Sequence, residues 1–192
     1  MKHATAISLQ PSRRAFLHRS AQVVMLGTGL GLAARKARAA PASVRSLMLD
    51  HTHTHERIDL VYASGAQYVP QALGTLNHFL RDHYSGEVGQ IDPHLFDLLH
   101  DVRLALGSGT PLTYQIISGY RGPLTNARLR STRGGGVAKH SLHMEGKAID
   151  IRLPGVPLAE LRDAALSLKA GGVGFYPSEQ FVHIDTGRVR TW

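Results

Sequence analysis

The ten residues Ser141-Leu-His-Met-Glu-Gly-Lys-Ala-Ile-Asp150 organise the rest of this chain. Together with the later run Phe181-Val-His-Ile-Asp185 they offer two imidazoles, from His143 and His183, and the carboxylate of Asp150. Such a set holds a divalent metal and leaves one position open for water, which is typical of a catalytic site. Structural zinc sites are usually closed by four ligands and rich in Cys, and this chain has no Cys. The two stretches therefore predict a catalytic metal centre.

The aspartate of this set falls on a predicted strand over residues 147–153. Isoleucines alternate there with Asp150 and Arg152, so the apolar and the charged side chains face opposite sides. An ionised aspartate on a central strand is costly to bury without a partner. A bound metal ion removes that cost, and Gly146 at the preceding turn lets the backbone fold so that His143 approaches Asp150.

Two acidic residues near the last histidine are candidates for the general base. On the strand expected over residues 181–185, Asp185 shares a face with His183 about 7 Å away, within reach of a metal-bound water. Glu179 has the same parity but lies about 13 Å from His183 if the strand stays extended. A turn at residues 177–178 would bring Glu179 back. We therefore prefer Asp185 as the base and keep Glu179 as the alternative.

The loop Gly119-Tyr-Arg-Gly-Pro123 follows a run of β-forming residues at 113–118. A loop at the end of a buried strand is where a rigid fold presents functional side chains. Arg121 is therefore expected to meet an anion, either a substrate carboxylate or the oxyanion that forms when water adds to a carbonyl. The alternative is an ion pair that only holds the loop. Tyr120 and Ser141 are further candidates for substrate contact.

The first 39 residues have the features of a twin-arginine signal peptide. Ser12-Arg-Arg-Ala-Phe-Leu17 precedes an apolar run over residues 21–34 and the small-residue site Ala37-Arg-Ala39. The apolar run is shorter than the roughly 20 residues that span a bilayer. We therefore expect cleavage after Ala39, export to the periplasm, no stable membrane insertion afterwards, and a mature domain over residues 40–192.

The basic charge of the chain is concentrated in this signal segment. It holds seven of the 22 Lys and Arg residues and no Asp or Glu, which leaves fifteen basic against fourteen acidic side chains. A near-neutral domain lacks the electrostatic footprint of a nucleic-acid-binding protein, so we expect no nucleic-acid partner. Its length suits one domain with a single core, and we expect a monomer. Without Cys, stability must come from packing and from a metal.

Hydrophobic spacing indicates an α+β fold. Apolar residues recur every three or four positions over residues 70–83, 92–107 and 156–169, which predicts three amphipathic helices. Residues 125–130 suggest a short helix, and a loop containing Gly134-Gly-Gly136 follows it, placed to close over a cleft. We expect a single domain with a small, mainly antiparallel sheet flanked by helices, its strands lying at residues 43–49, 58–63, 113–118, 147–153, 173–176 and 181–185.

A histidine-rich run begins at His51, where His51, His53 and His55 alternate with threonines. On an extended strand all three imidazoles would share one face, which is compatible with metal binding. The run supplies no carboxylate ligand, however. An exposed hairpin of polar residues is therefore the favoured interpretation.

Three motifs resemble one family. Ser-x-His-x-x-Gly-x-Ala-x-Asp at 141–150, Ser-Gly-Tyr-Arg at 118–121 and Phe-Val-His-x-Asp at 181–185 are similar to motifs of the zinc D-alanyl-D-alanine carboxypeptidase family. The likeness is greater still to its exported branch of MepK-type murein endopeptidases, and it covers residues 43–192. It implies a hedgehog/D-Ala-D-Ala-peptidase-like fold.

The resemblance also implies roles for individual residues. His143, Asp150 and His183 would be the ligands of one Zn²⁺ ion, and Arg121 would help to stabilise the tetrahedral intermediate. Other members place a catalytic Glu or His a few residues before the last ligand, where this chain has Glu179 followed by Gln180.

The function expected from these residues and this resemblance is that of a zinc-dependent murein peptidase. Its substrate would be an amide bond of peptidoglycan stem peptides, most simply a cross-link cut by an endopeptidase. The alternatives are a carboxypeptidase that trims terminal D-alanine and a non-catalytic cell-wall-binding module that keeps zinc for structure. An iron oxygenase is disfavoured, because such enzymes commonly place their first two ligands two residues apart, whereas six residues separate His143 from Asp150.

Overall fold

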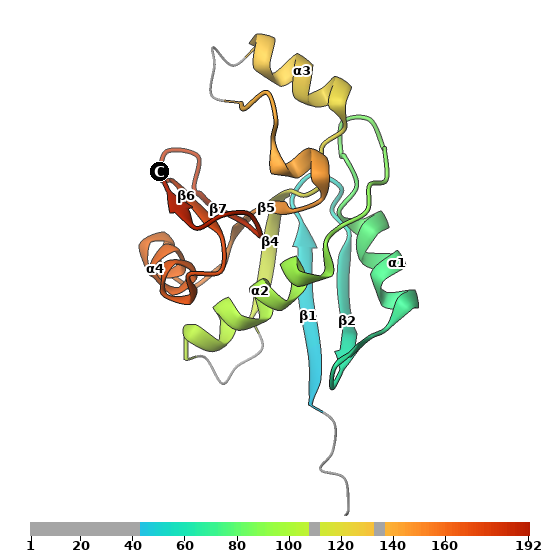
Figure 1. The fold of residues 1–192 in the computed structure, drawn as a ribbon, viewed down its shortest axis with the longest axis vertical. Coiled ribbons are helices and arrows are strands. Elements are labelled where there is room, and N and C mark those ends of the chain that lie inside the picture. The colour runs from blue at the N-terminus through green and yellow to red at the C-terminus, as the bar shows by residue number, and fades with distance from the viewer. Residues whose placement is uncertain (1–42, 108–111, 133–136) are drawn as a thin grey trace, which may run out of the picture. The chain divides into compact units, whose positions relative to one another are not determined.

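The computed structural model describes residues 43–107, 112–132 and 137–192, which belong to one compact unit (Figure 1). The predicted signal peptide and the loop at Gly134–Gly136 lie outside the described residues. Within the described ranges, no helix combines the length and the apolar character needed to cross a membrane.

One eight-stranded sheet forms the centre of the fold, in the order β3-β2-β1-β4-β5-β7-β6-β8. Neighbouring strands are antiparallel except for the parallel pairs β1/β4 and β6/β8. The predicted mainly antiparallel sheet is therefore confirmed, with more strands than expected. The strands are β1 (Val44–His51), β2 (Arg57–Ser64), β3 (Gln67–Tyr68), β4 (Thr113–Ser118), β5 (Ala148–Arg152), β6 (Gly172–Tyr176), β7 (Phe181–Asp185) and β8 (Arg190–Thr191).

The helices are α1 (Pro70–Phe79), α2 (Pro93–Ala105), α3 (Pro123–Thr132), the 3₁₀ helix η1 (Leu142–Glu145) and α4 (Leu158–Leu168). Helix α2 begins as predicted, because the Asp92 carboxylate accepts the backbone N–H of His94 at 3.0 Å and a proline occupies the first turn. Helix α1 is shorter than predicted. Past Phe79 the Asp82 carboxylate accepts the backbone N–H groups of Tyr84 and Gly122, which stabilises a turn instead of another helical turn.

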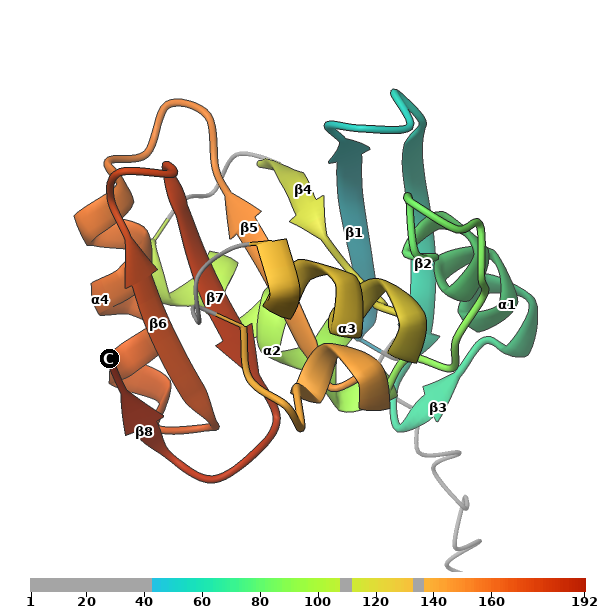
Figure 2. The same ribbon diagram turned by 90° about the horizontal axis from the view of Figure 1, so that it is seen from above.

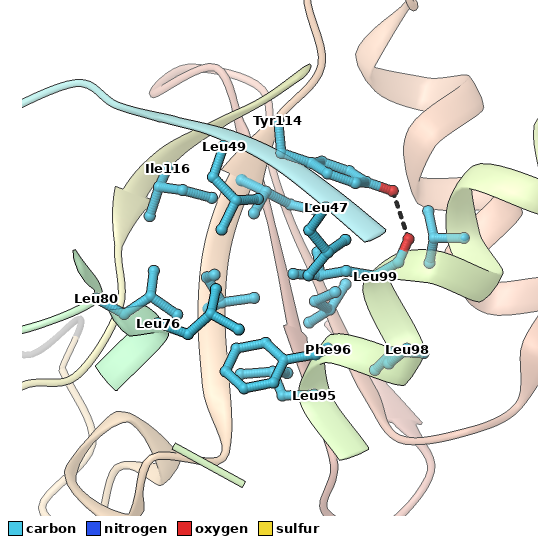
Figure 3. Packing of buried hydrophobic residues seen from close by; sticks show 14 of the residues in the cluster. Leu47, Leu49, Leu76, Leu80, Leu95, Phe96, Leu98, Leu99, Tyr114 and Ile116 are labelled. Atoms are coloured by element: carbon cyan, nitrogen blue, oxygen red, sulfur yellow. Dashed lines mark hydrogen bonds between the residues drawn. The ribbon is translucent and has the colours of Figure 1, made fainter. Parts of the chain in front are cut away.

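Helices α1, α2 and α4 pack their apolar residues against one face of the sheet, where Leu49 and Ile116 meet Leu76 and Leu95 (Figure 3). The buried Tyr114 hydroxyl donates to the carbonyl oxygen of Leu99 at 2.8 Å, so the polar end of this large ring is satisfied within the core. Strand residues of the other parity point away from these helices, and the side chains of the predicted metal site belong to that set. Helix α3 and η1 lie beside each other where β4 ends and β5 begins (Figures 1 and 2).

The hairpin that joins β1 to β2 departs from the prediction. His51 is fully buried and its ring contacts Phe79 and His83, each with ring centroids 5.7 Å apart, whereas His53 and His55 are exposed in the turn. The strand ends at His51, so the alternation that would align the three imidazoles stops there. The expected exposed hairpin is thus right for the turn and wrong for His51.

Candidate metal centre

Asp150 and His183 lie directly opposite each other on the paired strands β5 and β7. On β5 the neighbouring isoleucines fill the core, while Asp150 points to the other face of the sheet. The same alternation on β7 buries Val182 and Ile184 in the core and turns His183 towards Asp150. The sheet register therefore fixes two of the three predicted ligands.

His143 reaches the same place from the short helix η1. The Ser141 hydroxyl accepts the backbone N–H of His143 at 3.4 Å and caps this helix. Gly146 then reverses the chain with φ +66°, and a Cβ at this position would lie 1.9 Å from the carbonyl oxygen of Gln90. Only glycine fits such a turn. The prediction that Gly146 brings His143 back to Asp150 is confirmed.

The side-chain atoms of these three residues converge. His143 Nε2 lies 3.2 Å from His183 Nδ1 and 3.3 Å from Asp150 Oδ1, and His183 Nδ1 lies 2.9 Å from the same oxygen. Ligand atoms at about 2.0–2.1 Å from a tetrahedral zinc ion stand about 3.3 Å apart. In the described part of the chain, no other group of three His, Asp or Glu residues is arranged to hold a metal.

The outer nitrogen of each imidazole is already engaged. His143 Nδ1 donates to the carbonyl oxygen of Gly119 at 2.7 Å, and His183 Nε2 donates to Asp185 Oδ2 at 3.1 Å. When the inner nitrogens are also unprotonated, as metal ligation requires, two lone pairs and a carboxylate oxygen face one another. Three acceptors at such distances repel each other unless a cation lies among them. The residues present therefore fit a divalent metal ion.

Burial and the local hydrogen bonds set the charges of the centre. Burial lowers the pKa of His143, which keeps this imidazole neutral. Burial alone would raise the pKa of Asp150, but the neighbouring His143 and His183 hold it well below its usual range. Burial would also lower the pKa of His183, yet its hydrogen bonds to Asp150 and Asp185 raise it above the ordinary value. The imidazoles shift in opposite directions because only His183 contacts two carboxylates.

Asp185 is fully buried on the outer edge of the His183 ring, away from the converging atoms. Its Oδ1 accepts the backbone N–H groups of Gly172 at 3.0 Å and Gly187 at 2.8 Å, and both carboxylate oxygens bind the guanidinium of Arg190 at 3.0 and 2.7 Å. Burial would raise the pKa of Asp185, but these partners, His183 first among them, hold it well below its usual range. The carboxylate therefore fixes the orientation of His183.

Glu179 lines a cleft of about 480 Å³ that contains the three converging residues, together with Arg121 and Ser141. The turn between β6 and β7 returns Glu179 to this cleft, and Gln180 supports the turn with φ +61°. Strand β7 begins only at Phe181, so the extended path that would separate Glu179 from His183 is not followed. Glu179 faces the cleft that holds the metal-site residues, whereas Asp185 does not line it.

Arg121 stands beside the centre, with Nη2 3.8 Å from Asp150 Oδ2 and 3.5 Å from the Ser118 hydroxyl. Tyr120, also predicted to contact substrate, does not line the main cleft. Its ring borders an adjoining cavity of about 100 Å³, which Arg121 and Asp150 also line, and its hydroxyl donates to Glu87 at 3.0 Å. Of the three predicted substrate contacts, Arg121 and Ser141 line the main cleft.

Trp192 and Tyr176 line the cleft without having been predicted. The Trp192 ring lies 5.2 Å from the His183 ring, its Nε1 donates to the Tyr176 hydroxyl at 2.7 Å, and Arg190 packs over it at 4.8 Å. We call Arg190, Trp192 and Asp185 the brace of His183. The parallel pairing of β8 with β6 brings Arg190 and Trp192 to the site, and no local sequence pattern indicates such a pairing. The only Trp of the chain was the one available signal.

Comparison with known proteins assigns the sequence to a family. A family described as peptidoglycan L,D-endopeptidase MepK matches residues 39–192. Proteins named peptidoglycan L,D-endopeptidase MepK from Escherichia coli K12 and from Shigella flexneri are each 47% identical over 148 residues, which cover 77% of this chain and 80% of theirs. A probable peptidoglycan L,D-endopeptidase MepK from Haemophilus influenzae is 40% identical over 148 residues, 77% of this chain and 78% of its own.

No solved structure matches the chain. The family match includes the strands and turns that bring His143, Asp150 and His183 together. The resemblance inferred from the three motifs is confirmed. The chain belongs to the peptidoglycan L,D-endopeptidase MepK family.

Proposed function

We propose that this protein is a zinc-dependent peptidase that hydrolyses amide bonds in peptidoglycan cross-links. The observation that carries the proposal is the convergence of three acceptor atoms, from His143, Asp150 and His183, in an open cleft. The names of relatives that are 40–47% identical support peptidoglycan as the substrate class.

The three converging residues would hold the metal, and the open side of the cleft gives room for water and a scissile amide. A zinc ion bound there would act as a Lewis acid and lower the pKa of its water towards about 7. The chain itself orients the ligands, through Gly119 for His143 and Asp185 for His183.

We assign proton transfer to the Glu179 carboxylate and a positioning role to Asp185. A general base must reach the proton it accepts. Glu179 lines the cleft, whereas Asp185 has both oxygens engaged by the backbone, Arg190 and His183. Glu179 would accept a proton from the attacking water and deliver it to the leaving amine. This assignment reverses the order of preference that strand parity suggested.

Arg121 would donate to the oxygen of the amide carbonyl as negative charge develops on it. Its guanidinium stands at the wall of the cleft, 3.8 Å from Asp150. Fixed donors aimed at a developing oxyanion are among the largest contributions to catalysis. Ser141 also lines the cleft and is proposed to contact the substrate, while Tyr120 is proposed to bind it through the adjoining cavity.

The first 39 residues indicate where the enzyme works. The twin-arginine motif, the short apolar run and the Ala-x-Ala site support export of the chain to the periplasm with removal of residues 1–39. Peptidoglycan is reached there, and a monomer would suffice because the described cleft is built from one chain.

Digestion of purified cross-linked muropeptides, followed by mass analysis, tests this function. The wild type should convert cross-linked dimers to monomers, and His183→Ala should not. The matched control is His78→Ala, which removes an exposed imidazole on α1 outside the cleft. Release of single alanine residues without loss of dimers would identify a carboxypeptidase instead. Dimers left intact by the zinc-loaded wild type would favour the wall-binding module.

A further inference from the structure

A row of polar side chains crosses the sheet next to the metal centre. Asp50 on β1, Gln115 on β4 and Arg152 on β5 are successive partners in the sheet register. Arg152 lies two residues after Asp150 on the same strand, so it projects from the same face about 7 Å along. This row therefore borders the centre on the side of the sheet that helices α1, α2 and α4 leave open.

The Arg152 side chain is oriented by one hydrogen bond and keeps other donors available. Its Nε donates to Gln115 Oε1 at 2.7 Å, which orients the guanidinium along the row. Among the residues that the structure describes, its two Nη nitrogens have no hydrogen-bond partner and no carboxylate lies within ion-pair distance. These nitrogens are also absent from the buried unpartnered polar atoms, so solvent reaches them. A guanidinium that is oriented through Nε and has both Nη nitrogens available can donate two parallel hydrogen bonds to a carboxylate.

The row also leads into a groove of about 490 Å³ on the same face, lined by Asp50, Gln115, Arg57 and Asp59 among others. Asp50 pairs with Arg57 at 3.0 Å, so its charge is already balanced. Asp59 lies on β2, three strands away from β5, which is about 14 Å. Neither carboxylate compensates Arg152, and the positive charge beside the groove remains available to a ligand.

We propose that Arg152 binds a carboxylate of the peptide substrate two or three residues from the scissile bond. The inference rests on the proposed function, since it places one arm of the substrate along β5, from the centre into the groove. The distance of about 7 Å between Asp150 and Arg152 corresponds to two residues of extended peptide. The arm would present this carboxylate either at its chain end or on an acidic side chain. Charge complementarity favours such an occupant, and the other two members of the row, Asp50 and Gln115, line the groove.

Kinetics on matched substrates test this proposal. The same cross-linked peptide is prepared with free carboxylates, with only the chain-terminal carboxylates amidated, and with all carboxylates amidated. A charge-assisted hydrogen bond contributes about 1.5–3 kcal/mol, so full amidation should reduce kcat/KM of the wild type roughly 10- to 100-fold, mainly through KM. The partly amidated peptide identifies which carboxylate Arg152 binds. Arg152→Gln should lose the same factor on the free substrate and nothing on the fully amidated one.

Two further variants complete the experiment. Arg152→Lys keeps the charge without the planar fork and should retain part of the effect. Arg103→Gln is the control, because it removes a half-buried arginine on α2 that also lacks an ion pair in the described structure. It should leave kcat/KM unchanged on both substrates. Equal kcat/KM of the wild type on the free and the amidated peptides would overturn the proposed role of Arg152 and leave the proposed function standing. An equal loss of kcat/KM on both peptides in Arg152→Gln would do the same. A wild type that cleaves neither peptide would overturn the proposed function itself.

Discussion

Two pairs of histidines in the described part of the chain have nearly the same ring geometry and different surroundings: His143 and His183 are both buried, whereas buried His51 contacts the half-buried His83. The rings of His143 and His183 stand 5.0 Å apart at 67°, and those of His51 and His83 stand 5.7 Å apart at 67°. In the first pair both outer nitrogens are held by acceptors and both inner nitrogens point at Asp150. The second pair has no such carboxylate.

The pair at His51 uses its nitrogens differently. His51 Nδ1 accepts the backbone N–H groups of His53 and Thr54, which forms the turn of the hairpin, and Nε2 is buried without a hydrogen-bond partner. His83 Nε2 is likewise buried and unpartnered. Both pairs contain two imidazoles. The candidate metal centre therefore differs from the structural cluster in which ring nitrogens are held by outer hydrogen-bond acceptors and which point at a carboxylate.

The largest expected effect comes from removing the charge that distinguishes the pairs. Asp150→Asn keeps the shape of the side chain but leaves the inner nitrogens of His143 and His183 without an anion. Substitution of a residue that only hydrogen-bonds to a metal ligand typically costs roughly 10- to 100-fold in activity. We expect a greater loss of activity here, together with loss of stoichiometric zinc. Metal analysis after nickel-free purification measures this. His51→Gln is the control, and zinc loss in that variant would contradict the comparison.

Glu179→Gln should give the next largest effect. Positioned acid–base groups contribute about 10²–10⁴-fold, so kcat should fall by that factor. The zinc Kd, measured by competition with a chelator, should stay constant because Glu179 is not among the converging residues. An unchanged kcat would return the role of base to Asp185.

Asp185→Asn tests whether the outer partner of His183 matters for the metal. We expect zinc affinity to fall about 10- to 100-fold, with activity restored at high zinc, since such partners orient the ligand and fix its tautomer. If Asp185 were the base, kcat would stay low at saturating zinc while the Kd remained that of the wild type.

The smallest effect concerns the pair formed by His51 and His83. Burial, with a smaller contribution from neighbouring positive charge, lowers the pKa of both His51 and His83 to about 4. A histidine neutral in the folded state contributes stability that is complete above the unfolded pKa of about 6.5 and is lost as pH falls towards 4. Between pH 7 and pH 4.5, the free energy of unfolding of His51→Gln should therefore fall by on the order of 2 kcal/mol less than that of the wild type. Urea unfolding at both pH values, at equal zinc concentration, measures the free energy of unfolding of each protein. The same change in this free energy with pH in the wild type and the variant would contradict the prediction.

The sequence predicted those features that local patterns determine. Alternation on the strand around Asp150 indicates which side chains leave the core, and Gly146 marks the turn that returns His143. The proposed preference for Glu179 over Asp185 as the base depends on the path of residues 177–180, where a left-handed Gln180 ends the extended geometry assumed from parity.

Features set by distant pairings were less accessible. The burial of His51 depends on Phe79 and His83 from another element, and Trp192 arrives only through the pairing of β8 with β6. Periodicity in a single segment carries no information on either contact. These are the places where the observed structure adds most to the sequence.

The location of the brace along the chain has a consequence for biosynthesis. His183, Asp185, Arg190 and Trp192 follow all other elements of the site, so a ribosome releases them after η1 and β5 have emerged. Until then the nascent chain exposes a central strand whose aspartate has no opposite histidine. A metal ion held by all three converging side chains would therefore bind only after β7 has emerged, and a chain that stopped before His183 would lack one of the three.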